Sequence, residues 1–106
     1  MTRGDVYRIR LGGTRGREQH GPRYGVVVQA DRYLALSTVL VAPTSRSAPV
    51  RTFRPEVSVL GEPTSVMVEQ MRALDLGRLT ERVGRLDASE LRAVDDVLEL
   101  VLDLRV

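Results

Sequence analysis

The chain of 106 residues contains no cysteine, no tryptophan and no lysine. Without cysteine it has no disulfide framework, no thiolate nucleophile and no cysteine-ligated metal site, which fits a reducing cytoplasm. No apolar run is long enough to span a membrane, and the first residues lack the apolar core of a signal peptide. With 42% hydrophobic residues, we expect a cytoplasmic globular protein that forms a single domain over residues 1–106.

Positive and negative charges are divided unevenly between the two halves of the chain. Residues 1–54 hold ten arginines against three acidic residues, whereas residues 55–106 hold six arginines against eleven acidic residues. The exclusive use of arginine fits either bidentate phosphate contacts or arginine-rich codon usage, and both explanations remain open. Because clustered arginines bind phosphate backbones, the first half predicts a nucleic-acid surface.

Strand-like patterns fill the first two thirds of the sequence. Residues 5–11 alternate between apolar and polar positions, and four later segments are rich in β-branched residues. Residues 11–23 are polar and contain four glycines and a proline, so they predict a long loop between the first two strands. The predicted strands are Asp5 to Leu11, Tyr24 to Ala30, Thr38 to Ala42, Val57 to Leu60 and Ser65 to Val68. Five short strands favour a small β-barrel.

The last third predicts an amphipathic helix. Asp87 and Glu90 have the spacing of a capping box, and acidic residues occupy the face opposite the apolar one. We interpret this segment as a helix packed on the barrel, which makes the fold class mixed β and α. The predicted apolar face consists of Leu91, Val94, Val97, Leu98, Val101 and Leu102.

Few residues suggest a familiar catalytic chemistry. His20 is the only histidine, and in the predicted loop it is either a proton carrier or an ordinary exposed side chain. No compact cluster of His, Asp and Glu has the spacing of metal ligands, so we expect a metal-free mechanism without a cofactor. Gly12-Gly13-Thr14-Arg15-Gly16 lacks the lysine of a phosphate-binding loop.

Several short motifs occur in a characteristic order along nearly the whole chain. They are Arg3-Gly4-Asp5-Val6-Tyr7, Gly16-Arg17-Glu18-Gln19-His20-Gly21-Pro22-Arg23, Val41-Ala42-Pro43-Thr44-Ser45, Glu69-Gln70-Met71-Arg72-Ala73-Leu74-Asp75 and Gly84-Arg85-Leu86. In this order they resemble the motifs of the MazF/PemK toxins of bacterial toxin-antitoxin systems. None of them is specific alone, and the resemblance rests on their order.

The resemblance implies an SH3-like β-barrel with a C-terminal helix, a homodimer and a metal-independent endoribonuclease that is specific for short sequences in single-stranded RNA. In that family the substrate's own 2′-hydroxyl attacks the neighbouring phosphate, which leaves a 2′,3′-cyclic phosphate and a 5′-hydroxyl. By the motif match, Arg23 and Thr44 are the catalytic residues. A guanidinium beside a hydroxyl donor suits the charge that develops on the phosphorane.

The resemblance also implies further site residues and a protein partner. Substrate binding falls to polar residues beside the catalytic pair, which can shape the site or contact unstacked bases. The partner is a cognate antitoxin, similar to MazE, whose acidic disordered tail would suit the arginine-rich face. The candidate substrate-binding residues are Arg17, Glu18, Gln19, Ser45 and Gln70.

The chain also departs from the family pattern. Tyr24 replaces the proline that usually follows the arginine, and its ring is either a stacking platform or a core residue. Arg17, Met67 and Glu69 stand where one branch of the family has histidine, arginine and aspartate, which argues against a His-Arg-Asp mechanism.

Two other functions remain open on the same fold. The first is a gyrase-inhibiting toxin similar to CcdB, although this chain lacks the Trp-Gly-Ile tail of that group and ends Asp103-Leu104-Arg105-Val106. The second is a nucleic-acid-binding module without catalysis. A shared fold does not decide among these functions, so the choice depends on the residues of the site.

Overall fold

The computed structural model describes residues 1–11, 23–49 and 51–104, in which seven strands form one antiparallel sheet. The strands pair in the order β4-β5-β3-β2-β1-β7, and β6 pairs with the second edge of β3. The strands are β1 (Asp5–Ile9), β2 (Arg23–Val27), β3 (Thr38–Ser45), β4 (Glu56–Val59), β5 (Glu62–Val66), β6 (Arg72–Asp75) and β7 (Leu79–Arg85).

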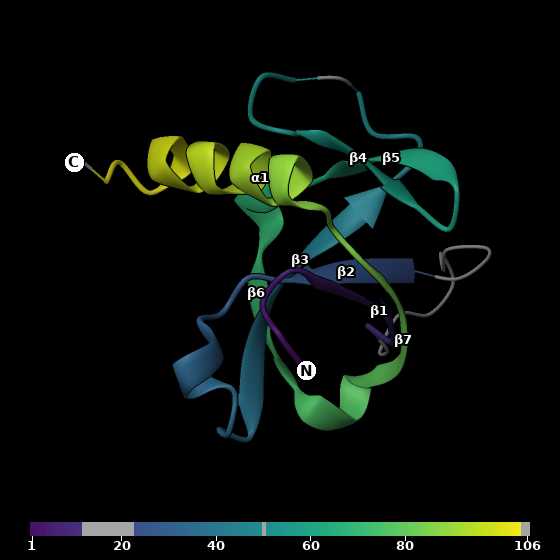
Figure 1. Cartoon of the computed structure of the whole chain (residues 1–106), viewed down its shortest axis with the longest axis vertical. Helices are drawn as coiled ribbons and strands as arrows, with labels where there is room; N and C mark the ends of the chain where they lie inside the picture. Colours follow the sequence, from purple (N-terminus) through teal and green to yellow (C-terminus); the bar gives the residue numbers. More distant parts are fainter. Residues whose placement is uncertain (12–22, 50, 105–106) are drawn as a thin grey trace.

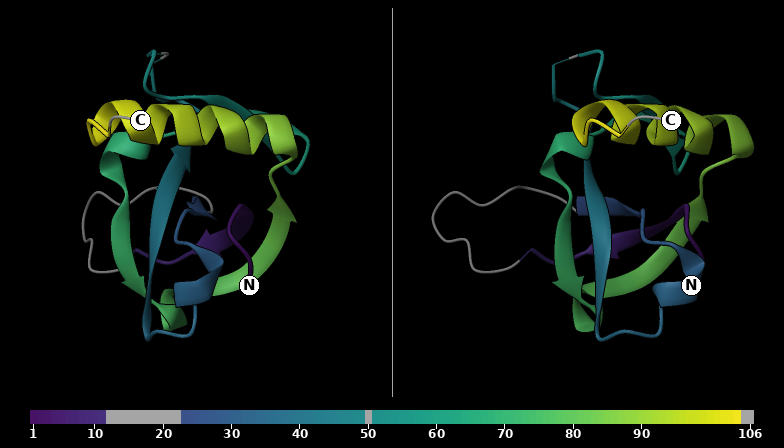
Figure 2. Two further views of the ribbon diagram at one scale, coloured as in Figure 1. Left: turned by 60° about the vertical axis from the view of Figure 1, so that its left-hand side comes forward. Right: turned by 90° about the vertical axis from the view of Figure 1, so that its left-hand side faces the viewer.

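Within the described ranges, one α-helix and three short 3-10 helices accompany the sheet (Figure 1). The sheet curls below α1 (Ala88–Val101), and β6 and β7 lie on opposite sides of the curl (Figure 2). This half-barrel with a C-terminal helix confirms the predicted mixed β and α fold class. The 3-10 helices are η1 (Asp31–Tyr33), η2 (Val68–Gln70) and η3 (Leu76–Arg78).

The five predicted strands are present with shifted ends, but the prediction missed β6 and β7. β6 has four residues between two 3-10 helices, so it offers little alternation to detect. β7 is half exposed, and its pairing with β1 contains two register shifts that interrupt a regular two-residue period. β3 runs three residues further than predicted, to Ser45, because its last residues pair with β5.

Valines fill two cores on opposite faces of the sheet. Val26 belongs to the core below α1, whereas Val27, its neighbour in β2, belongs to the core on the other face. Both valines are fully buried. A strand segment buried on both faces has no need for polar alternation, which explains the consecutive valines at the end of β2.

Helix α1 begins as predicted and ends differently. Asp87 and Glu90 form the capping box, because the Asp87 carboxylate accepts from the Glu90 N–H at 2.8 Å and the Glu90 carboxylate accepts from the Asp87 N–H at 2.9 Å. At the C-terminal end of the predicted apolar face the cover is incomplete, since Val101 is 37% and Leu102 is 47% exposed. In the view of Figure 1 the C-terminal end of α1 projects past the sheet.

Candidate active site

Thr44 lies in β3, where this strand crosses from the main sheet to the β4-β5 hairpin. Its backbone pairs with Val66 in β5. Its hydroxyl donates a hydrogen bond to the Tyr24 carbonyl oxygen in β2 at 3.4 Å, and the residue is 5% exposed. Thr44 therefore does not cap a turn, and its long hydrogen bond is a weak one.

Arg23 is the first residue of β2 and the first described residue after position 11. It pairs with Ile9 of β1 and is half-buried. The β2-β3 register pairs Gly25 with Pro43, and one further step brings Tyr24 beside Thr44. The structure therefore brings Arg23 and Thr44 onto adjacent strands, within one residue of each other in register.

The side chains of Arg23 and Thr44 leave the sheet on opposite faces. Cross-strand neighbours share a face and successive residues alternate, so Thr44 shares its face with Tyr24, and Arg23 shares the other with Ser45. No hydrogen bond joins Arg23 to Thr44 among the described residues. The structure thus places these two described residues on adjacent strands, with no hydrogen bond between their side chains.

Gln70 approaches β3 from the opposite edge, as the last residue of η2. The Met67 N–H donates to the Pro43 carbonyl oxygen at 2.8 Å, which fixes the start of this segment beside Thr44. Gln70 itself is exposed. The structure thus brings Thr44, Ser45 and the Gln70 segment to one part of β3, with the Gln70 amide accessible.

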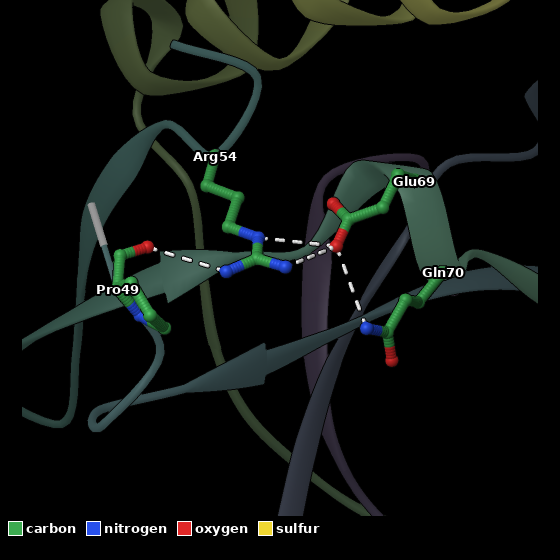
Figure 3. A network of polar contacts seen from close by, with 4 residues as sticks. All are labelled: Pro49, Arg54, Glu69 and Gln70. Atoms are coloured by element: carbon green, nitrogen blue, oxygen red, sulfur yellow. Dashed lines mark hydrogen bonds and ion pairs between the residues drawn. The ribbon is translucent and has the colours of Figure 1, made fainter. Parts of the chain in front are cut away.

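An arginine that sequence reasoning missed supports the Gln70 segment (Figure 3). Arg54 donates to one carboxylate oxygen of Glu69 from Nε at 3.1 Å and from Nη2 at 2.8 Å. Its Nη1 donates to the Pro49 carbonyl oxygen at 3.3 Å, and the Gln70 amide lies 3.4 Å from the same Glu69 oxygen. Arg54 therefore links the β3-β4 connection to η2. No sequence motif joins these residues, so only the tertiary structure reveals the link.

The ionisation of Glu69 follows from this contact. Partial burial raises the pKa of Glu69, but the hydrogen bonds and the positive charge of Arg54 outweigh that effect and hold the pKa below its ordinary value of 4.5. Glu69 is therefore ionised at neutral pH, where it accepts hydrogen bonds and cannot act as a proton donor.

Tyr24 has mainly a structural role in the described residues. It is half-buried and packs against the core that contains Val26, while its carbonyl oxygen receives the Thr44 hydroxyl. These contacts favour the core interpretation of Tyr24 over the stacking one. The ring still borders the site, because it shares a face with Thr44.

The remaining predicted site residues, Arg17, Glu18 and Gln19, lie outside the described residues together with His20. In the part of the chain that the structure describes, no three side chains of His, Cys, Asp or Glu gather as metal ligands would. Of the described helices, none combines the length and the apolar character that crossing a membrane requires.

Solved structures of related shape define the class of fold. MazF from Deinococcus radiodurans superposes with a TM-score of 0.80 and 22% identity, over 98% of this chain and 97% of that one. A MazE-MazF structure from the same organism gives a TM-score of 0.80 and 24% identity, over 99% and 97% of the two chains. The half-barrel with its C-terminal helix is therefore a MazF-type fold.

The sequence itself decides the family. A model of the family described as PemK-like, MazF-like toxin of type II toxin-antitoxin system matches residues 2–102. The chain belongs to this family, as its motif order predicted.

Two proteins of similar sequence are named endoribonucleases. Endoribonuclease MazF9 of Mycobacterium tuberculosis is 35% identical, with 98% of each chain covered. Endoribonuclease MazF of Staphylococcus epidermidis is 33% identical, over 98% of this chain and 92% of the other. These relatives confirm the prediction of an RNA-cleaving enzyme class.

Proposed function

We propose that this chain is the toxin of a type II toxin-antitoxin system and cuts single-stranded RNA at a short sequence without a metal ion. The observation that carries the proposal is the placement of Thr44 beside the first residues of β2, which include Arg23. Relatives named endoribonucleases support it. The proposal treats residues 1–106 as one cytoplasmic toxin domain.

The proposed reaction needs no nucleophile from the protein. The 2′-oxygen of the substrate forms a bond to the adjacent phosphorus and loses its proton, while the bond from phosphorus to the 5′-oxygen breaks and that oxygen gains a proton. The products are a 2′,3′-cyclic phosphate and a 5′-hydroxyl. DNA cannot react in this way because it lacks the 2′-hydroxyl.

Arg23 and Thr44 stabilise the phosphorane in this proposal. Arg23 acts through the positive charge of its guanidinium group, which has donors and no acceptor and so does not serve as a general base. The Thr44 hydroxyl is held by one long hydrogen bond to the Tyr24 carbonyl, which it can exchange for a stronger bond to a charged phosphate oxygen.

The polar residues around this pair bind the substrate. Gln70 is exposed, and Ser45 is half-exposed at the end of β3, so both offer hydrogen bonds to bases or sugars. The family motif adds three further residues to the proposed substrate-binding set, Arg17, Glu18 and Gln19. Substitution of each, followed by measurement of RNA binding, tests this role.

Two protein partners complete the proposal. The first is a second copy of the chain, supported by apolar side chains at the exposed end of α1, such as Leu100 at 71% exposure. The second is an antitoxin similar to MazE, supported by the MazE-MazF structure from Deinococcus radiodurans and by the arginine-rich first half of this chain. Saturating antitoxin is expected to inhibit RNA cleavage.

The deciding experiment incubates the purified protein with mixed-sequence RNA and matching DNA in the presence of EDTA, and maps the cuts and the new ends. We expect cuts in RNA only, at a recurring short sequence, with cyclic phosphate and 5′-hydroxyl ends. An Arg23→Ala variant should bind RNA without cutting it, whereas Arg92→Gln, which removes an exposed charge on α1, should cut normally. If the wild-type protein cuts no RNA, the gyrase-directed or binding-only alternatives gain support.

A further inference from the structure

A row of four residues crosses the sheet at the candidate active site. Arg8 of β1 pairs with Tyr24 on one side and with Glu81 of β7 on the other. Tyr24 in turn lies beside Thr44. Because cross-strand neighbours share a face, Arg8 stands on the same face as Thr44, two strands away and at a spacing of about 10 Å.

Along β1 and β2, the side chains of this row are more exposed than those of the neighbouring residues below α1. Along β1, Val6 is 1% exposed below α1, whereas the Arg8 side chain, two residues further, is 49% exposed. Along β2, burial decreases in the same direction, from fully buried Val26 to half-buried Tyr24. The face that carries Arg8 is therefore accessible to a ligand at Arg8 and is partly covered at Tyr24, while Thr44 at the other end of the row is 5% exposed.

Arg8 has only a weak ion pair in the described residues. Its Nη1 lies 3.9 Å from a Glu81 carboxylate oxygen, and the Glu81 side chain is 62% exposed. An exposed pair at this separation contributes little to stability. Arg8 is therefore available for a stronger partner, unlike Arg54, which donates two hydrogen bonds, of 3.1 and 2.8 Å, to Glu69.

We propose that Arg8 binds a backbone phosphate of the RNA that flanks the scissile one. A guanidinium suits this ligand because it offers paired donors to phosphate oxygens, and its distance from Thr44 suits a neighbouring nucleotide and not the reacting phosphate. The inference rests on the proposed ribonuclease function and adds a subsite to it. Arg8 is a binding residue in this proposal, and the chemical step does not depend on it.

The test uses Arg8→Gln, Arg8→Lys and the control Arg92→Gln, with an RNA oligonucleotide from the mapped wild-type cleavage sites. A 2′-deoxy sugar at the cut position prevents cleavage, so affinity can be measured as a function of salt. We expect Arg8→Gln to weaken binding about tenfold and to reduce the salt slope by roughly 0.7, the share of one phosphate in a single strand. Arg8→Lys should keep most of the slope.

Kinetics and a second variant sharpen the test. For cleavable RNA, Arg8→Gln should raise KM and leave kcat near the wild-type value, because the lost contact is made equally in the ground and transition states. Glu81→Gln should tighten binding, since it removes both the partner of Arg8 and a charge that repels phosphate. An unchanged salt slope in Arg8→Gln would overturn the proposal, provided that the wild type cuts RNA. Failure of the wild type to cut would instead contradict the proposed function itself.

Discussion

At the scale of one residue, Thr44 is a buried hydroxyl with a structural contact, and we propose a chemical role for the same hydroxyl. It is 5% exposed and bonds to a carbonyl of the neighbouring strand, which is a structural contact. The same contact holds the hydroxyl beside the first residues of β2, which include Arg23. A substitution that keeps the shape and removes the hydroxyl separates the two roles.

We expect Thr44→Val to reduce kcat by about a hundredfold or more, because it removes a donor to the developing charge. Its stability should change by only about 1 kcal/mol, since the lost hydrogen bond is long and the volume is kept. Thr44→Ser should retain most of the activity. The measurements are single-turnover cleavage and urea unfolding, and normal cleavage by Thr44→Val would exclude Thr44 from the mechanism.

Glu69 leads to a prediction about pH. The folded-state pKa of Glu69 lies below the ordinary 4.5, so the Arg54 pair stabilises the fold above about that pH, and this contribution is lost as pH falls through the folded-state value. Glu69→Gln should therefore lower stability at neutral pH and have little effect at a pH well below 4.5. Urea unfolding of both proteins over this range tests it, and an equal loss at every pH would contradict it.

At the scale of elements, the start of β2 depends on the close packing of Gly25 between two strands. A Cβ at this position would collide with the Val41 side chain of β3 and lie 3.2 Å from Ile9 of β1. Both neighbours belong to the core on the face away from α1. A side chain at position 25 would therefore force the Val41 side chain or β2 itself to shift.

We expect Gly25→Ala to destabilise the fold by about 1–3 kcal/mol through overpacking and to lower cleavage by displacing β2. A matched control is Gly77→Ala, because a Cβ there meets no atom within 4 Å. Thermal unfolding and cleavage rates of the two variants make the comparison. Equal stability of both variants would show that the core around Val41 adapts without cost.

Contacts between elements also explain the presence of the first family motif, Arg3 to Tyr7. Arg3 donates from Nε to the Val28 carbonyl at 2.8 Å and forms an ion pair with Asp95 of α1 at 2.7 Å. Gly4 adopts a φ of 95°, which favours glycine, and its carbonyl oxygen accepts from the Leu86 N–H at 2.9 Å. This motif ties the N-terminus to β2 and α1, so its role is structural.

At the scale of the whole molecule, the end of α1 carries apolar side chains that this chain does not cover. Leu100 and Leu104 are 71% and 56% exposed, and the helix projects past the sheet there (Figure 1). Exposed leucines gathered at one end of a molecule are typical of an interaction surface. They support the proposed homodimer.

We expect the wild-type protein to sediment as a dimer and the double variant Leu100→Glu, Leu104→Glu to shift toward the monomer, because burying two carboxylates in an apolar contact is costly. Leu36→Glu is the control, since Leu36 is equally exposed, at 55%, but lies between η1 and β3. Sedimentation velocity over a range of concentrations makes the comparison. A double variant that stays dimeric would place the interface elsewhere.

Most of the architecture could be predicted because it depends on local patterns. The capping box of Asp87 and Glu90 and the alternation of β1 are properties of neighbouring residues, and both are present in the structure. The exposed end of α1 could not be predicted, because helical spacing shows which residues share a face and not how far the sheet extends beneath them.

The sequence by itself determined the family, the mixed β and α fold class with its C-terminal helix and the positions of Arg23 and Thr44 in the motif order. Only the tertiary structure decided that Arg54 holds Glu69 and that Arg8 pairs with Tyr24, whose carbonyl oxygen accepts from Thr44. The physical reason is the distance along the chain between the residues that interact. Strand and helix patterns arise from neighbouring residues, whereas ion pairs and cross-strand rows join residues whose separation along the chain carries no signal of their contact.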